Sequence, residues 1–216
     1  MNTDFARRQM VEQQVRAWAV LDTEILELLF ETPREQFVPP GFETLAFADT
    51  EIPIGHGQRM MTPTLEGRVL QSLKISKTDS VLEIGTGSGY LTACIAKLAD
   101  SVTSIDVHED FLEAAAANLE DSGISNFELT AMDATQRLPE GEFDAIVITG
   151  SMQVLHPRYG LALRPKGRLF VVVGHRPTMD ARLLQRTGDS SWLTKSLFET
   201  ELDPLENSAQ PPQFSF

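Results

Sequence analysis

The hydrophobic residues of this chain fall into short runs with two different spacings. Between residues 78 and 200, compact apolar runs have the length of strands buried in a parallel sheet. Strands are expected at Ser80–Ile84, Val102–Ile105, Phe127–Thr130, Ala145–Thr149 and Arg168–Val173. Segments with helical spacing separate most of them, at Tyr90–Leu98, Glu109–Asp121 and near Tyr159–Leu163. This alternation predicts a doubly wound α/β fold, with helices on both faces of a mostly parallel sheet.

The first 77 residues show a different pattern, that of a helical extension. An amphipathic helical face is indicated by Phe5, Met10, Val11, Gln14, Val15 and Trp18. Asp22 is a good N-cap for a second helix at Thr23–Phe30. Prolines and glycines then break regular structure, and they predict a loop around Pro53–Gly57, with a helix restarting near Pro63.

The end of the chain predicts a change from parallel to antiparallel strands. Two strand-like runs, Ala181–Arg186 and Trp192–Glu199, flank the turn-forming segment Thr187–Ser190. Such a pattern is typical of a β-hairpin. The last segment, Asp203–Phe216, is rich in Pro, Gln and Ser and is expected to be irregular, with its terminal phenylalanines, Phe214 and Phe216, as candidates to dock on the surface.

Length, charge and cysteine content limit the number of domains, the partners and the cellular location that we expect. A chain of 216 residues with 42% hydrophobic residues suits one domain, divided here into 1–77, 78–200 and 201–216. The net charge of −13, with scattered basic residues, argues against nucleic acid as a partner. The absence of a signal-like segment or a bilayer-length apolar run, and a single cysteine, Cys94, predict a cytoplasmic protein that does not contact membranes. Oligomeric state stays open.

A glycine-rich segment after the first predicted strand indicates a cofactor site. The run Glu83-Ile84-Gly85-Thr86-Gly87-Ser88-Gly89 ends a hydrophobic strand in an acid and opens a helix. Glycines allow a tight turn and close approach to a ligand. The dinucleotide fingerprint places its third glycine one residue later, so NAD is disfavoured and S-adenosylmethionine is the expected cofactor.

Acidic residues after the next two strands support this interpretation. Asp106-Val107 follows the second strand, where a carboxylate can accept hydrogen bonds from ribose hydroxyls. Asp133-Ala134 follows the third, in place to accept from the adenine amino group, and Thr149 ends the fourth. Together these positions predict a Rossmann-like class I methyltransferase. The plainer alternative is that the glycines only make a turn and the acids are solvated caps.

Segments outside the cofactor motif resemble one family. Pro33–Pro39, Phe47–Gln58 and Met10–Val15 resemble segments of the protein-L-isoaspartate O-methyltransferases, and the similarity runs from about Met1 to Val173. The resemblance implies methyl transfer to the carboxylate of isoaspartyl residues in damaged proteins or peptides. It also identifies a substrate loop, whose residues are Ile54, Gly55, His56, Gly57, Gln58 and Arg59.

The chain departs from this family at the expected acceptor site. Where the family carries an active-site serine, alignment through Gln58 and Pro63 places Met61, with Thr62 the nearest hydroxyl. We expect the Met61 side chain to face the methyl-donor pocket. The alternative is that Met61 points into the core and Thr62 takes the polar role. Met132 and Ala134 likewise replace glycines that commonly flank the family's acid.

Three hypotheses about function follow from these observations. The chain methylates isoaspartyl carboxylates, or it methylates another acceptor on the same scaffold, or it binds the cofactor without transfer. The four histidines, His56, His108, His156 and His175, lack the spacing of metal ligands, so no metal site is expected.

Overall fold

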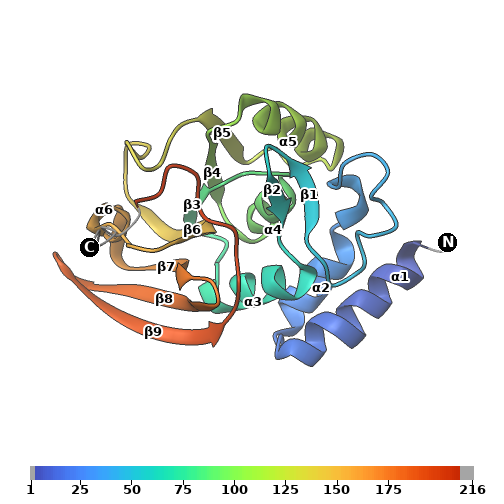
Figure 1. The fold of residues 1–216 in the computed structure, drawn as a ribbon, viewed down its shortest axis with the longest axis horizontal. Helices are drawn as coiled ribbons and strands as arrows, with labels where there is room; N and C mark the ends of the chain where they lie inside the picture. Colours follow the sequence, from blue (N-terminus) through green and yellow to red (C-terminus); the bar gives the residue numbers. More distant parts are fainter. Residues whose placement is uncertain (1–2, 210–216) are drawn as a thin grey trace, which may run out of the picture.

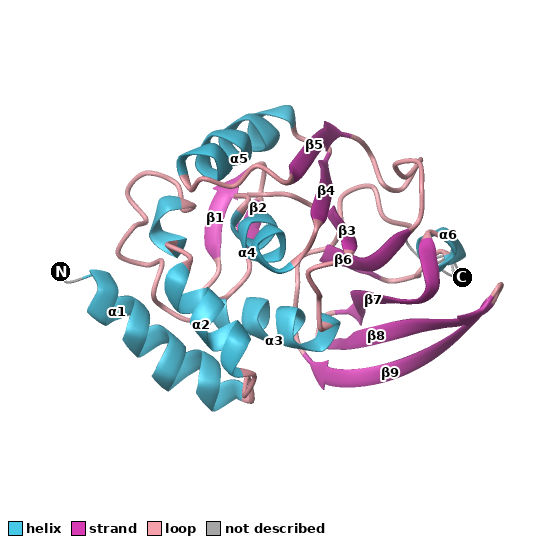
Figure 2. Ribbon diagram, turned by 180° about the vertical axis from the view of Figure 1, so that it is seen from behind, coloured by secondary structure: helices cyan, strands magenta, loops and turns pink. Residues whose placement is uncertain are grey.

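The computed structural model describes residues 3–209, and its centre is a seven-stranded sheet (Figures 1 and 2). The strand order is β5-β4-β3-β6-β7-β8-β9. The first five strands in this order are parallel, and β8 and β9 continue the sheet antiparallel. The bounds are β3 Ser80–Ile84, β4 Ser101–Asp106, β5 Phe127–Ala131, β6 Phe143–Met152, β7 Leu163–His175, β8 Thr178–Gly188 and β9 Ser191–Glu199. The predicted Rossmann-like fold, a mostly parallel sheet that ends in an antiparallel hairpin, is confirmed.

The two faces of the sheet are covered unequally. One face packs against α3 (Pro63–Leu73), α4 (Tyr90–Leu98) and α5 (Glu109–Asp121). Residues of one strand alternate between the faces: Val81 lies in this core, whereas Leu82 lies in the opposite one. That second core has only the short α6 (Pro157–Leu161) as its helix. The expectation of helices on both faces therefore holds for one face in full and for the other only through α6.

The N-terminal segment is helical but changes type along its length. It runs through α1 (Thr3–Gln9), the π-helix η1 (Met10–Val15), the 3₁₀ turn η2 (Arg16–Trp18), α2 (Thr23–Glu31) and the 3₁₀ turn η3 (Arg34–Gln36). The expected apolar face is wrong at its two ends, since Phe5 is 60% and Trp18 58% exposed. The change of helical period moves these residues off the buried stripe. Asp22 caps α2 as predicted, accepting from the Glu24 amide.

The expected loop around Pro53–Gly57 is in fact a small hairpin. Strands β1 (Ile52–Gly55) and β2 (Gln58–Met60) pair antiparallel and lie between the N-terminal helices and the cofactor end of the main sheet (Figure 1). The turn between them needs left-handed backbone, with φ of 50° at His56 and 72° at Gly57. Helix α3 follows the hairpin directly, and its N-cap is Thr62.

The segment after β9 is irregular in secondary structure, as expected, but it is firmly placed. The Ser151 amide donates to the Asp203 carbonyl at 2.7 Å, and the Leu205 amide donates to the Ser151 carbonyl at 2.8 Å. We call residues 201–209 the strap. Phe214 and Phe216 lie outside the described residues. No helix among residues 3–209 is long and apolar enough to span a membrane.

Candidate active site

The glycine loop joins the end of central strand β3 to α4, as the sequence predicts. Gly85, Gly87 and Gly89 all have positive φ. A side chain at Gly85 is sterically excluded, since an added Cβ would lie 2.1 Å from the Thr149 hydroxyl. That hydroxyl donates to the Ile84 and Gly85 carbonyls at 2.9 and 2.8 Å. Thr149 therefore supports the shape of the loop from β6.

Glu83 is the next-to-last residue of strand β3, just before this loop, and is fully buried. Its Oε2 accepts hydrogen bonds from the hydroxyls of Thr92 and Ser104. Its Oε1 is buried and has no hydrogen-bond partner among the described residues. Burial raises the pKa of Glu83 to about 7, against the opposing effect of the two hydroxyls. An unpaired buried carboxylate oxygen in a cavity wall is suited to a cationic ligand group.

Asp106 ends the neighbouring strand β4 and is tied to the loop. One carboxylate oxygen accepts from the Gly87 amide at 3.0 Å, and the other from the His108 amide at 3.1 Å. The side chain is thus held at the mouth of the glycine loop, with Val107 next to it in the cavity wall. Each oxygen keeps a lone pair for a further donor.

Asp133 follows β5 and lies on the far side of the cavity. Its Oδ1 accepts from the amide and hydroxyl of Thr135 at 2.8 and 2.6 Å. Its Oδ2 accepts from the side-chain amide of Asn207, in the strap, at 3.1 Å. Ala134 is buried beside it. The strap therefore reaches the carboxylate that the sequence assigns to adenine.

One cavity joins the glycine loop to the β1–β2 hairpin. Its wall includes Glu83, Gly85, Thr86, Gly87, Ser88, Asp106, Val107, Asp133, Ala134 and Thr149 from the predicted cofactor set. From the predicted substrate loop it includes Ile54, Gln58 and Arg59. The remaining predicted residues, Gly55, His56, Gly57 and Gly89, lie outside the wall and shape the turns that support it.

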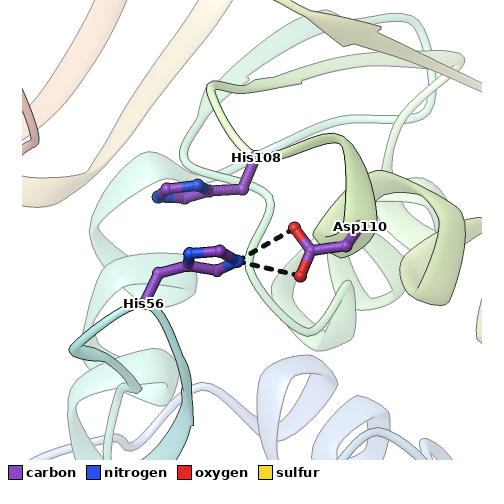
Figure 3. A group of neighbouring side chains, drawn as sticks. All are labelled: His56, His108 and Asp110. Carbon is purple, nitrogen blue, oxygen red and sulfur yellow. Dashed lines mark hydrogen bonds and ion pairs between the residues drawn. The ribbon is translucent and has the colours of Figure 1, made fainter.

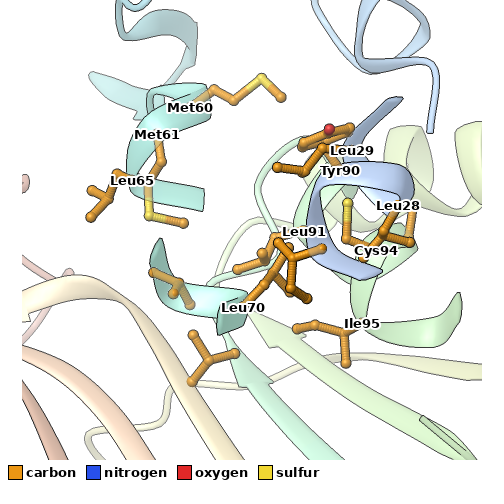
Figure 4. Close-up of a cluster of buried hydrophobic side chains, with 14 of the residues drawn as sticks. Leu28, Leu29, Met60, Met61, Leu65, Leu70, Tyr90, Leu91, Cys94 and Ile95 are labelled. Carbon is orange, nitrogen blue, oxygen red and sulfur yellow. The ribbon is translucent and has the colours of Figure 1, made fainter. Parts of the chain in front are cut away.

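Met61 and Thr62 occupy different environments although they are adjacent. Met61 is 7% exposed; it lies in the cavity wall and also packs in the core. Figure 4 shows it beside Leu65, with Met60 extending toward Tyr90. Thr62 lies outside the wall, where its hydroxyl caps α3 by accepting from the Leu65 amide at 3.3 Å. The Thr62 hydroxyl, the nearest in sequence to Met61, therefore caps a helix and does not face the cavity.

A buried ion pair, which was not predicted from the sequence, holds the segment that carries Met61. Arg34 is fully buried and donates to the carboxylate of Glu66 at 3.0 Å, to the Met61 carbonyl at 2.5 Å and to the Ala46 carbonyl at 2.9 Å. Glu66 is also in the cavity wall. Burial raises its pKa to about 7, and the Arg34 charge opposes this. A charged residue inside the apolar face of α3 was the available signal.

The strap is the other part of the site that sequence reasoning missed. Residues Leu202, Asp203, Pro204, Leu205 and Glu206 all contribute to the cavity wall. Arg59 links the strap to the hairpin, bonding Asp203 at 2.5 Å and Glu51 at 2.8 Å. A tail rich in Pro and polar residues carries no periodic signal, and its position depends on long-range pairing with β6.

Comparison with known proteins connects this geometry to a family. The family profile described as protein-L-isoaspartate(D-aspartate) O-methyltransferase matches residues 6–210. The chain belongs to this family. It is 38% identical over 184 residues to the protein-L-isoaspartate O-methyltransferase of Methanoculleus marisnigri, covering 84% of each chain. It is 34% identical over 200 residues to that of Roseiflexus castenholzii, covering 92% of this chain and 91% of the other.

A solved family structure has the same fold. The protein-L-isoaspartate O-methyltransferase from Plasmodium falciparum, in complex with S-adenosyl-L-homocysteine, superposes with a TM-score of 0.82 at 20% identity, over 94% of this chain and 99% of that one. The cofactor of this methyltransferase family is S-adenosylmethionine, as predicted. The residues fit it: positive-φ glycines leave a cradle closed to any side chain, and Glu83 presents an unpaired oxygen.

Proposed function

We propose that this chain methylates the α-carboxylate of isoaspartyl residues in damaged proteins or peptides, with the reacting groups meeting between the glycine loop and Met61. The observation that carries the proposal is the single cavity whose wall contains both the cofactor residues and the hairpin segment Arg59–Met61. The family profile and relatives at 34–38% identity over most of their length support the reaction.

Methyl transfer to a carboxylate does not require a general acid or base. When bound, S-adenosylmethionine would supply a methyl group on a positively charged sulfur. An acceptor carboxylate oxygen would bond to the methyl carbon in line as the carbon–sulfur bond breaks, with S-adenosylhomocysteine as the leaving group. An α-carboxyl has a pKa of roughly 3.3–3.7 and is already ionised at neutral pH, so no base has to remove a proton. The protein has to align the two groups and keep water out.

The described residues are suited to those two tasks. Glu83 and the glycine loop would hold the methionyl end of the cofactor, with Asp106 at the ribose and Asp133 at the adenine. Met60 and Met61 provide an apolar, water-excluding wall, since both are less than a tenth exposed. Arg59 is also in the cavity wall; its charge is paired with Glu51 and Asp203, so its role is to link the hairpin beside Met61 to the strap.

A second acceptor class is favoured by one observation. The thioether of Met61 accepts hydrogen bonds only weakly and donates none, so it does not position a carboxylate as a serine hydroxyl does. An apolar wall formed by two methionines suits a less polar acceptor. On this alternative the cofactor site is unchanged and only the acceptor differs.

The experiment that separates these functions compares two peptides. The protein is incubated with labelled S-adenosylmethionine and an isoaspartyl peptide, or its normal aspartyl counterpart. We expect base-labile methyl ester only on the isoaspartyl peptide. Equal labelling of both peptides, or labelling of neither while cell extract is methylated, would favour the second acceptor class.

A further inference from the structure

The fold brings together two histidines that are far apart in the sequence. His56 lies in the β1–β2 turn and His108 at the start of α5, and their rings stack with centroids 3.9 Å apart (Figure 3). Both rings also pack edge-on against Phe111, at 5.2 Å. These two histidines lack metal-ligand spacing along the sequence, but the fold places their rings side by side.

Two carboxylates complete the group. His56 Nε2 lies 2.9 Å from Asp110 Oδ2; dashed lines mark the contact of these two side chains in Figure 3. His108 Nε2 lies 2.8 Å from Glu206 Oε2, in the strap. Potential ligand atoms of His56, His108 and Asp110 all lie within 4.8 Å of one another. These side chains come from the hairpin, α5 and the strap, so one ligand set spans three segments.

We propose that His56, His108 and Asp110, with Glu206 as a fourth ligand, form a binding site for a divalent transition-metal ion such as Zn²⁺. Imidazole nitrogen and carboxylate oxygen are ligands that zinc prefers. Four donors at bond lengths of about 2.0–2.1 Å place the ligand atoms roughly 3.3 Å apart in a tetrahedral site. Atoms already within 4.8 Å need only small side-chain movements to reach that spacing.

The stacked rings must tilt for this to happen, and the exposure of His56 allows it. A metal ion binds in the plane of an imidazole, so two stacked rings have to tilt toward a shared point. The His56, Asp110 and Glu206 side chains are 42%, 64% and 43% exposed and are free to move. The His108 side chain is 18% exposed and packs against Phe111, so most of the movement falls on His56. The cost is loss of one ring stack and two hydrogen bonds, which metal–ligand bonds replace.

The site has a consequence for the neighbouring cavity. His108 and Glu206 both belong to the cavity wall that holds the predicted cofactor residues. A metal ion bridging them to the hairpin would fix the strap and the hairpin against each other. Zinc and S-adenosylhomocysteine are therefore expected to bind with positive coupling.

The test is calorimetry with ZnCl₂ on the full chain carrying no histidine tag. We expect one zinc ion per chain, and at least about tenfold weaker binding in His56→Asn and His108→Ala, because loss of even a ligand's supporting partner weakens metal sites 10–100-fold. Asparagine tolerates the left-handed backbone at position 56. His175→Ala, at the end of β7, is the matched control and should bind zinc as the natural chain does.

Histidine-ring NMR provides a readout that does not depend on a variant folding. Among the four histidines, zinc should shift the ring signals of His56 and His108 and leave those of His156 and His175 unchanged. MgCl₂, an oxygen-seeking ion, should shift none. Zinc that shifts all four histidines alike, binds equally to His56→Asn and the natural chain, or does not bind would overturn the proposal.

Discussion

At the scale of single residues, Met61 determines the rate of methyl transfer that we expect. It lies in the cavity wall at the point where the family resemblance places a serine, and Thr62 is occupied as the cap of α3. A hydroxyl that aligns the acceptor contributes about 1–3 kcal/mol, or roughly 5- to 150-fold in rate. We therefore expect the natural chain to methylate isoaspartyl peptides slowly.

Restoring the hydroxyl tests this account. Met61→Ser should raise kcat/KM on an isoaspartyl peptide by about tenfold, because a serine can hydrogen-bond the acceptor carboxylate. Met61→Ala is the matched control, since it opens a similar cavity without supplying a donor. Steady-state kinetics of both variants check the prediction; a natural chain that is fast and is slowed by serine would show that Met61 itself aids transfer.

Glu83 carries a second prediction at this scale, which concerns pH. Its folded pKa of about 7 exceeds its ordinary value of 4.5, so the folded state retains a proton that the unfolded state loses between these values. Its contribution to stability is therefore full below about pH 4.5 and falls as pH rises to 7, by at most about 3 kcal/mol.

Glu83→Gln should remove this dependence. Urea unfolding should show that the variant becomes more stable relative to the natural chain as pH rises from 5 to 8, because only the natural chain loses stability over this range. Calorimetry should show weaker S-adenosylhomocysteine binding in the same variant. A difference in stability that stays constant across this range would mean that Glu83 is ionised throughout.

At the scale of elements, the Arg34–Glu66 pair joins η3 to α3 and holds the Met61 carbonyl. Breaking a buried ion pair leaves one charge without compensation, which destabilises proteins by about 3–5 kcal/mol. Glu66→Gln should lose about that much in urea unfolding, whereas the double variant Arg34→Met with Glu66→Leu should recover most of it. Equal stability of the single variant and the natural chain would contradict this role.

Thr62 provides the complementary prediction for α3. Removing an N-cap costs about 0.5–2 kcal/mol, so Thr62→Ala should lower the free energy of unfolding by about 1 kcal/mol. Its kcat/KM on an isoaspartyl peptide should change less than twofold, because the hydroxyl lies outside the cavity wall. A large loss of rate with unchanged stability would instead assign Thr62 the family serine's task.

Elements with strong local signals are those that the sequence predicted well. The bounds of β3, α4 and α5 match the expected segments, because each has a clear apolar period and a defined start. The hairpin at Ile52–Met60 was expected as a loop, since it contains Pro53, Gly55 and Gly57. Pairing between β1 and β2 overrides those local preferences.

At the scale of the whole molecule, the cavity is closed by two segments far apart in the sequence, the hairpin and the strap, whose contact the sequence did not predict. Arg59 and Asp203 are 144 residues apart and form an ion pair between the hairpin and the strap. His56 and His108 are likewise brought together only by the tertiary fold. The cofactor motif was predictable because its residues follow consecutive strands, whereas contacts across the mouth depend on packing that no local pattern encodes.

The strap contact carries a prediction at this scale. Arg59→Ala removes ion pairs to Glu51 and Asp203, which are partly exposed and worth about 0.2–1 kcal/mol each. Together they contribute about 0.4–2 kcal/mol, so dissociation of S-adenosylhomocysteine should quicken by roughly two- to thirtyfold in stopped-flow measurements. Arg182→Ala, whose ion pair is to Asp180 within β8 and not to the strap, is the control and should have a smaller effect. An unchanged rate in Arg59→Ala would mean that the strap does not limit release.

The central claim is that this family member transfers methyl from S-adenosylmethionine to isoaspartyl carboxylates in the cavity between the glycine loop and Met61. Labelled-methyl transfer to an isoaspartyl peptide and its aspartyl counterpart measures this most directly. The account predicts slow methyl ester formation on the isoaspartyl peptide alone, accelerated by Met61→Ser and lost in Asp106→Ala together with S-adenosylhomocysteine binding. No ester on the isoaspartyl peptide from the natural chain or from Met61→Ser, with cofactor binding intact, would contradict it.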